Sequence, residues 1–188
     1  MPELHLDGYI DRKTLILGDV NTGKTTLTRR VLEALCRRGL GGRIAVVDMA
    51  PEIPKGLAEG KGIPGVGGKL TPPGGQGVLY LGGRLEPPRL GSKNEAEALK
   101  KACENRRIID GLFRELQPRE ILLVNDASIY LQAGSAEDLI PWFERADTVV
   151  ANGYWGHSVG EGVLTEREKV GMEKLKAYFE RRGRVLIL

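Results

Sequence analysis

The feature that most constrains the fold is the loop at residues 18–25, G-D-V-N-T-G-K-T, which stands between a short apolar run and a helical pattern. It matches G-x-x-x-x-G-K-[ST], in which backbone N–H groups surround a polyphosphate at the N-terminus of a helix. Gly18 and Gly23 are needed because the backbone must approach the phosphates closely, and a Cβ atom would block some of the required conformations. The motif therefore predicts a strand, a phosphate-binding loop and a helix in succession.

The chemistry of this loop assigns a role to most of its residues. Lys24 is expected to place a positive charge on the outer phosphates, and the Thr25 hydroxyl is expected to bind Mg²⁺. Asp19 is unusual because its carboxylate would repel a polyphosphate, so we expect its side chain to point away or to be paired. The predicted ligand is ATP or GTP with Mg²⁺, and the predicted contact residues are Gly18, Asp19, Val20, Asn21, Thr22, Gly23, Lys24, Thr25 and Thr26.

Apolar runs of strand length alternate with helical segments along the chain, which is typical of a three-layer α/β protein. Their Val, Ile and Leu content favours a mostly parallel sheet of about six strands that is buried on both faces. The predicted strands are 14–17, 43–48, 78–81, 120–125, 147–152 and 184–187. The predicted helices are 24–38, 93–116, 136–145 and 166–182, with start signals at Ser92, Ser135 and Thr165.

A long segment at 51–77 contains nine glycines and five prolines, too many for a regular helix or strand. It follows a predicted strand that ends at Asp48, on the sheet edge where open α/β sheets bind ligands. Two interpretations remain open: a plain surface excursion, or a mobile cover that closes over the nucleotide and over whatever receives or senses its phosphate.

Two carboxylates stand where predicted strands end, and a phosphate loop needs a carboxylate at the end of a neighbouring strand to hold Mg²⁺. Asp126 follows the apolar run 121–124 and is the first candidate for this metal site. Asp48 follows 44–47 and is a second metal candidate, which could also orient the attacking water or hydroxyl. We therefore predict Lys24, Asp48 and Asp126 as the catalytic residues. The alternative for either aspartate is a turn or helix cap after its strand.

Further candidates lie beyond the third and fifth predicted strands. Arg84 or Arg89 could neutralise charge in a phosphoryl-transfer transition state. Tyr154 and Trp155 could stack on a base, or could instead pack against a neighbouring helix.

The order of these features resembles the SIMIBI division of P-loop NTPases, which includes MinD-like ATPases, metallochaperone GTPases and a branch of polynucleotide 5′-hydroxyl kinases. The resemblance rests on the phosphate loop, on a strand ending in Asp48 after the first helix, and on the turn at 124–126 with Gly134 beyond it. The segment 146–153 is similar to the strand that ends in the N-K-x-D element of GTPases, with Asn152 at the asparagine position, which implies contact with the nucleotide base. The second lysine that is a signature of the division is replaced by Asp19.

Length, net charge and the distribution of apolar residues limit the classes of protein to which this chain can belong. The 188 residues are most simply one domain, and the net charge of +3 does not indicate a nucleic-acid surface. The sequence offers no secretory segment and no membrane-spanning run, so we expect a cytoplasmic protein. Abundant Arg and Glu with few Asn and Gln favour a heat-adapted source.

Three functions remain open on this evidence. The first is an NTPase that hydrolyses the γ-phosphate and signals its nucleotide state to a protein partner. The second is a kinase that acts on a hydroxyl of a small molecule or polynucleotide. The third is a nucleotide-binding module without catalysis.

Overall fold

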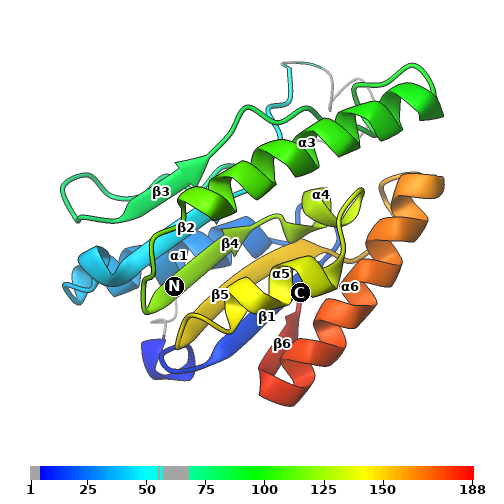
Figure 1. The fold of residues 1–188 in the computed structure, drawn as a ribbon. Coiled ribbons are helices and arrows are strands. Elements are labelled where there is room, and N and C mark those ends of the chain that lie inside the picture. Colours follow the sequence, from blue (N-terminus) through cyan, green and yellow to red (C-terminus); the bar gives the residue numbers. More distant parts are fainter. Residues whose placement is uncertain (1–4, 55, 57–67) are drawn as a thin grey trace.

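The computed structural model describes residues 5–54, 56 and 68–188, and it contains a six-stranded sheet in which every strand pair is parallel (Figure 1). The order across the sheet is β3-β2-β4-β5-β1-β6. The strands are β1 (Lys13–Gly18), β2 (Ile44–Asp48), β3 (Leu79–Gly82), β4 (Ile121–Asn125), β5 (Thr148–Tyr154) and β6 (Gly183–Ile187). All six predicted strands and the predicted α/β class are therefore confirmed.

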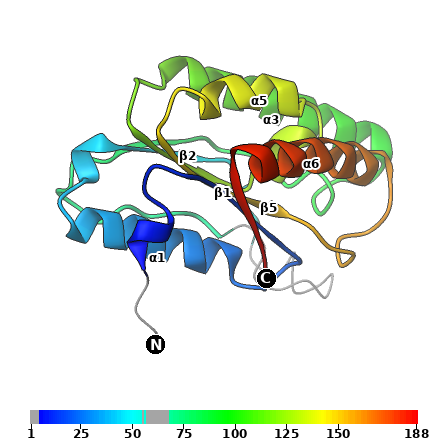
Figure 2. The ribbon, with the colours of Figure 1, turned by 90° about the horizontal axis from the view of Figure 1, so that it is seen from below.

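Helices cover both faces of the sheet. One face carries α1, and the other carries α3, α5 and α6, as the view from below shows (Figure 2). The α-helices are α1 (Lys24–Arg37), α3 (Glu95–Glu115), α4 (Ala127–Leu131), α5 (Ala136–Phe143) and α6 (Val163–Arg182), and two 3₁₀ turns are η1 (Leu6–Gly8) and η2 (Gly41–Arg43). None of the helices in the described part of the chain combines the length and apolar character needed to cross a membrane.

Each face of the sheet has its own apolar core, because strand side chains alternate between the faces. Leu15, Leu17 and Phe179 belong to the core beneath α3, α5 and α6, whereas Ile16 and Leu32 belong to the core beneath α1. The central strands β2 and β4 are buried along their whole length. This two-sided burial explains why their sequences are continuous apolar runs rather than alternating ones.

The register brings the chemically interesting residues to one edge. Gly18 pairs with Tyr154, and Asp48 pairs with Asn125, all at the carboxyl ends of their strands. The sequence led us to expect Asp126 at the end of a strand adjacent to β1. In the structure β5 lies between β1 and β4, so Asp126 follows a strand that is not adjacent to the one before the phosphate loop. Asp48 is one strand farther away, because β2 lies beyond β4.

Two of the three predicted helix starts are wrong. The Asn94 side chain, not Ser92, caps α3 by accepting from the backbone of Glu97. Helix α6 begins before Thr165, at Val163, so this residue lies inside the helix. Ser135 is confirmed as the cap of α5 and forms a reciprocal capping box with Asp138.

Candidate active site

A cavity of about 220 Å³ lies at the carboxyl edge of the sheet and joins the phosphate loop to the segments that follow β2, β3, β4 and β5. Such a position outside the strand ends is where open parallel sheets bind ligands. The lining residues are Val20, Asn21, Gly23, Lys24, Thr25, Thr26, Pro51, Ile53, Gly68, Pro87, Pro88, Arg89, Leu90, Asp126, Ile129, Gln132, Asn152, Tyr154 and Val159.

The phosphate loop has the backbone that the motif requires. Asn21 and Gly23 have φ values of 60° and 93°, in the left-handed region that glycine adopts without strain. A Cβ atom on Gly18 would come within 2.5 Å of the Thr22 hydroxyl oxygen, so this position also requires glycine. Lys24 begins α1, and its Nζ donates to the backbone oxygen of Asp19. The lysine is thus folded back over the loop, where an anion would compete for its ammonium group.

Asp19 is paired and turned away from the cavity, of which it is not a lining residue. One carboxylate oxygen accepts from the backbone of Val20, and the other accepts from His157 N at 3.1 Å and Ser158 Oγ at 2.8 Å. These donors lower the pKa of Asp19 despite some desolvation. The side chain therefore ties the phosphate loop to the connection between β5 and α6.

Asp126 lies on the cavity wall with Lys24 and Thr25. Its backbone is left-handed, with φ of 58°, and its N–H donates to Asn152 Oδ1 at 2.9 Å. Burial raises the pKa of the carboxyl group, and the positive charges of Lys24 and Arg89 partly offset that effect. Lys24 shows the complementary behaviour: burial lowers its pKa, and the charge of Asp126 opposes the shift.

Asp48 ends β2, and its carboxylate is enclosed by hydrogen-bond donors. Its side chain is fully buried, is not among the cavity-lining residues and accepts four hydrogen bonds. Their donors are Ala50 N, Asn125 Nδ2, Leu70 N and the Tyr80 hydroxyl, at 2.7–3.1 Å. A carboxylate with both oxygens occupied in this way joins β2 to β4 and to Leu70 in the glycine-rich segment. These contacts give Asp48 a structural role, and its predicted contact with metal or an attacking group stays a prediction.

Asn152 also has a structural position, in a chain of buried amides. Its Nδ2 donates to Asn125 Oδ1 and to the Thr28 hydroxyl, each at 2.9 Å, and its Oδ1 accepts the N–H of Asp126. The Thr28 hydroxyl in turn donates to the backbone oxygen of Lys24. Asn152 lines the cavity, and its amide holds Asp126 against α1. Its predicted contact with the nucleotide stays a prediction.

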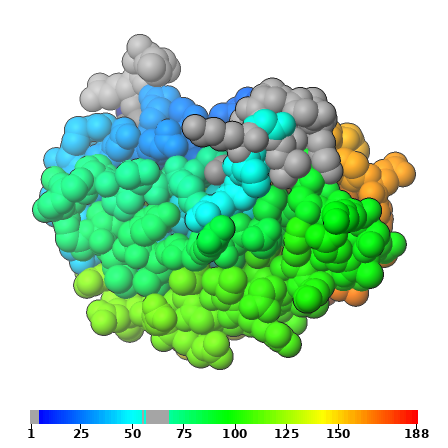
Figure 3. Space-filling view, turned by 90° about the horizontal axis from the view of Figure 1, so that it is seen from above, coloured from blue at the N-terminus to red at the C-terminus, as the bar shows by residue number. Residues whose placement is uncertain are grey.

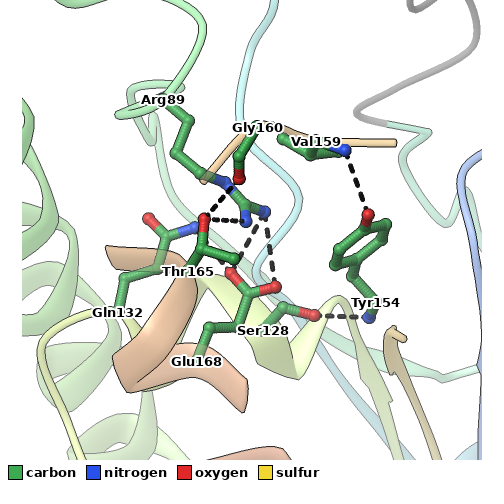
Figure 4. A network of polar contacts seen from close by, with 8 residues as sticks. All are labelled: Arg89, Ser128, Gln132, Tyr154, Val159, Gly160, Thr165 and Glu168. Atoms are coloured by element: carbon green, nitrogen blue, oxygen red, sulfur yellow. Dashed lines mark hydrogen bonds and ion pairs between the residues drawn. The ribbon is translucent and has the colours of Figure 1, made fainter. Parts of the chain in front are cut away.

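Arg89 is the centre of a second polar cluster on the cavity wall (Figure 4). Its guanidinium group is 3.1 Å from a carboxylate oxygen of Glu168 and lies over the Tyr154 ring, 5.4 Å from the centroid. Gln132 Nε2 donates to Glu168 at 3.0 Å, and the Thr165 hydroxyl accepts from Arg89 at 3.4 Å.

The two candidate arginines, Arg84 and Arg89, differ in their exposure and in their position relative to the cavity. The Arg89 side chain is 17% exposed, whereas that of Arg84 is 85% exposed and pairs with Glu52 at 3.6 Å. Only Arg89 lines the cavity.

Glu168 gives the protein a testable pH dependence. Burial raises its pKa from the ordinary value of 4.5 to about 7, although Arg89 opposes the shift. Between these values the folded state binds more protons than the unfolded state, so the free energy of unfolding falls as pH rises and levels off above about pH 7. The size of this contribution is about 3 kcal/mol. Urea unfolding from about pH 5 to about pH 8 should show a smaller decrease in Glu168→Gln than in wild type.

The matched control is Glu173→Gln, an exposed glutamate on the same helix, which should keep the wild-type decrease. An unchanged pH dependence in Glu168→Gln would assign the titration to another group.

Only part of the glycine-rich segment 51–77 is described, and the predicted mobile cover falls largely on 57–67, outside the described residues. The described part that begins at Gly68 contacts the site. Gly68 lies beside the Thr25 side chain, and its backbone oxygen accepts from Asn125 Nδ2 at 2.8 Å. In the space-filling view the residues after β2 (cyan) pack against the green segment beyond β3 (Figure 3), where Glu52 N donates to Leu85 O.

The fold brings most of the predicted phosphate-loop residues together with Asp126, Arg89 and Tyr154 around one cavity. Trp155 instead packs against the core under α6. Sequence reasoning missed Gln132 and Glu168. Thr165 and Glu168 are spaced as in a capping box, and the sequence analysis predicted one there. In the structure both side chains instead bind Arg89.

No protein-family model matches the chain, and no curated protein matches it. Among solved structures, the chain is similar to the flagellar accessory protein FlaH from Methanocaldococcus jannaschii, with 14% sequence identity and a TM-score of 0.40. That match covers 87% of this chain and 69% of the other. The parallel sheet with a phosphate loop between β1 and α1 is consistent with a P-loop NTPase fold.

Proposed function

We propose that the protein binds a nucleoside triphosphate with Mg²⁺ in this cavity and hydrolyses the γ-phosphate as a nucleotide-dependent switch. The observation that carries the proposal is that Lys24, Thr25 and Asp126 line one cavity at the N-terminus of α1. A cation, a hydroxyl group and a carboxylate at a helix N-terminus are the groups that phosphoryl transfer requires.

The donor set fits Mg²⁺, which prefers oxygen ligands and usually keeps several waters beside one or two protein groups. Thr25 and Asp126, which carry such oxygens, line the same cavity. When bound, Mg²⁺ would neutralise charge on the β- and γ-phosphates.

The chain's own groups would do the rest of the chemistry. Lys24 would leave the backbone oxygen of Asp19 to contact the outer phosphates, and the loop amides would stabilise charge on the leaving oxygens. Arg89 would stabilise negative charge that develops on the transferred group. Glu168 lies behind Arg89 and holds its guanidinium group in place.

Two connections support a switch. Asp19 links the phosphate loop to the connection after β5, and Asn125 links Asn152 to Gly68 in the glycine-rich segment. A change in the phosphate loop on nucleotide binding would therefore alter contacts of both surface segments. A partner protein that binds these segments would then distinguish the nucleotide-bound state from the free state.

A second candidate function, transfer of the γ-phosphate to a hydroxyl group, is favoured by the extent of the cavity. It continues past Asp126 to Pro87, Pro88 and Leu90, beyond β3. Hydrolysis needs room only for water, whereas a kinase needs room for an acceptor.

One experiment tests cleavage and the role of Arg89 together. Incubation with γ-labelled ATP or GTP and Mg²⁺ should release labelled phosphate, and Arg89→Ala should lower the rate by roughly 10²–10³-fold, as expected for a group that stabilises transition-state charge. Arg84→Ala is the matched control and should keep the wild-type rate. If the two variants are equally active, Arg89 has no part in the reaction; if wild type transfers no label to water or to any hydroxyl compound, catalysis is ruled out.

A further inference from the structure

Arg89 reaches the cavity from a short turn at residues 87–91, which we call the Arg89 turn. Pro87 and Pro88 precede the arginine, and each proline ring fixes its own φ. The turn closes through a hydrogen bond of 2.8 Å from Gly91 N to Pro87 O. Leu90 is 7% exposed, so burial of an apolar side chain also anchors the turn. These features restrict the backbone that carries Arg89.

A buried side chain on α3 holds the residue just before the Arg89 turn. Asn105 is 0% exposed, and its Oδ1 accepts the N–H of Glu86 at 3.0 Å. Its Nδ2 donates to the backbone oxygen of the same glutamate at 2.8 Å. A side-chain amide has both a donor and an acceptor, so it can bind both backbone groups of one residue. The pair of bonds fixes the position and the direction of the chain as it enters the turn.

Asn105 is the polar member of an otherwise apolar stripe on α3. The other buried residues of this helix are Ala102, Ile109 and Phe113. Burying an amide is unfavourable unless it is hydrogen-bonded, and an apolar residue would suit the stripe as well. What asparagine adds at this position is the pair of bonds to Glu86.

The same helix also holds the other end of the Arg89 turn. Lys101, one helical turn before Asn105, donates from Nζ to the backbone oxygen of Gly91. Its ammonium group also pairs with Glu97 on α3 at 3.0 Å. Both ends of the turn are therefore fastened to one rigid element.

The side chain of Arg89 is held from the opposite side, by α6. Its guanidinium group is 3.1 Å from a Glu168 carboxylate oxygen and 3.4 Å from the Thr165 hydroxyl (Figure 4). The backbone of Arg89 is thus fastened to α3 and its charged group to α6, with the cavity beside it. Loss of the contact with Asn105 would let the backbone move and carry the guanidinium group away from Glu168.

We propose that Asn105 is a positioning residue, which acts through the Arg89 turn to place the guanidinium group beside the reacting γ-phosphate. This inference rests on the proposed function, in which Arg89 stabilises charge on the transferred group. Asn105 itself is not one of the cavity-lining residues in the described part of the chain, so its effect has to pass through Arg89. A displacement of about 1 Å in a group that stabilises a transition state can cost about 10²-fold in rate.

The kinetic test replaces Asn105 by leucine, which has a similar volume and removes both hydrogen bonds. With γ-labelled ATP or GTP and Mg²⁺, kcat should fall by about 10–100-fold while KM is unchanged, because the displaced group acts on the transition state. In the Arg89→Ala background the same substitution should cause no further loss, since the group through which Asn105 acts is gone.

Phe113→Leu is the matched control. Phe113 is buried on the same helix, eight positions beyond Asn105, where its ring stacks on Trp142. This substitution should lower the melting temperature but keep the wild-type kcat. Asn105→Ala is the second variant, for use if Asn105→Leu does not fold.

A spectroscopic measurement reports the position of Arg89 without turnover. Carbon-13 NMR follows the titration of the Glu168 carboxyl group in the nucleotide-free protein, with the signal assigned by its loss in Glu168→Gln. Burial raises the pKa of Glu168 to about 7, Arg89 lowers it and Asp126 raises it. Asn105→Leu should shift the titration midpoint upward, toward that of Arg89→Ala, whereas Phe113→Leu should keep the wild-type midpoint.

The outcomes separate the positioning role from the proposed function. An unchanged kcat in both Asn105 variants, a rise in KM at unchanged kcat, or a further loss in the Arg89→Ala background overturns the positioning role. So does a wild-type Glu168 midpoint in folded Asn105→Leu. If the wild-type protein releases no labelled phosphate, the proposed function fails, and the NMR midpoints still decide whether Asn105 holds Arg89 in place.

Discussion

Replacing Lys24 by alanine is expected to abolish the rise in melting temperature that Mg²⁺ with ATP or GTP gives the wild-type protein. A ligand at about 100 times its Kd stabilises the folded state by about 2.7 kcal/mol. For a chain of this size, that corresponds to a rise of about 5–10 °C. The side chain lies on the cavity wall and begins α1, so its loss removes the point charge nearest the predicted phosphates. Differential scanning calorimetry with and without nucleotide measures the effect.

The control is Lys100→Ala, which removes an exposed lysine from α3 and should leave the nucleotide-dependent rise intact. A wild-type rise in Lys24→Ala would take Lys24 out of the site. If titration calorimetry of the wild-type protein gave no binding heat with either nucleotide in the presence of Mg²⁺, the nucleotide site itself would be refuted.

The second large effect is expected for Asp126→Asn, which should lower Mg²⁺-dependent turnover by roughly 10²–10³-fold. Asparagine keeps the size of the side chain and tolerates the left-handed backbone at this position. Nucleotide-dependent stabilisation should persist, because Lys24 and the loop amides remain. Steady-state phosphate release over a range of Mg²⁺ concentrations, combined with melting curves, separates loss of catalysis from loss of binding.

Asp147→Asn, an exposed aspartate just before β5, is the control and should retain wild-type turnover. Asp48→Asn makes the instructive comparison, since its main effect should be a loss of stability from the four hydrogen bonds that the carboxylate accepts. Full turnover in Asp126→Asn, together with inactivity of a folded Asp48→Asn, would move the metal role to Asp48.

The strands could be predicted because a strand buried on both faces has a local signature. Residues such as 44–47 and 121–124 are continuous apolar runs, and the runs alone placed the six strands to within one or two residues. Helix α4 was missed because its five residues, Ala127–Leu131, are too few to show a helical period. Its buried position beside Asp126 comes from tertiary packing against α3 and α6.

The roles of buried polar residues could not be predicted in the same way. Asp48 and Asp126 both follow apolar strands, and the sequence treats them almost alike. Only the strand order and the neighbouring donors show that Asp48 is enclosed by hydrogen bonds while Asp126 lies on the cavity wall. Asn152 is a similar case, because its partners are separated from it by up to 124 positions in the sequence.

The sequence by itself determined the strand–loop–helix unit at residues 13–37 and the α/β class, because glycine conformation, apolar runs and the lysine at a helix start are properties of short segments. The tertiary structure alone decided which charged groups share a cavity: Arg89 rather than Arg84, Asp126 rather than Asp48, with Glu168 and Gln132 behind them. The reason is that burial and pairing depend on contacts between segments far apart along the chain, and local sequence patterns carry no information about those contacts.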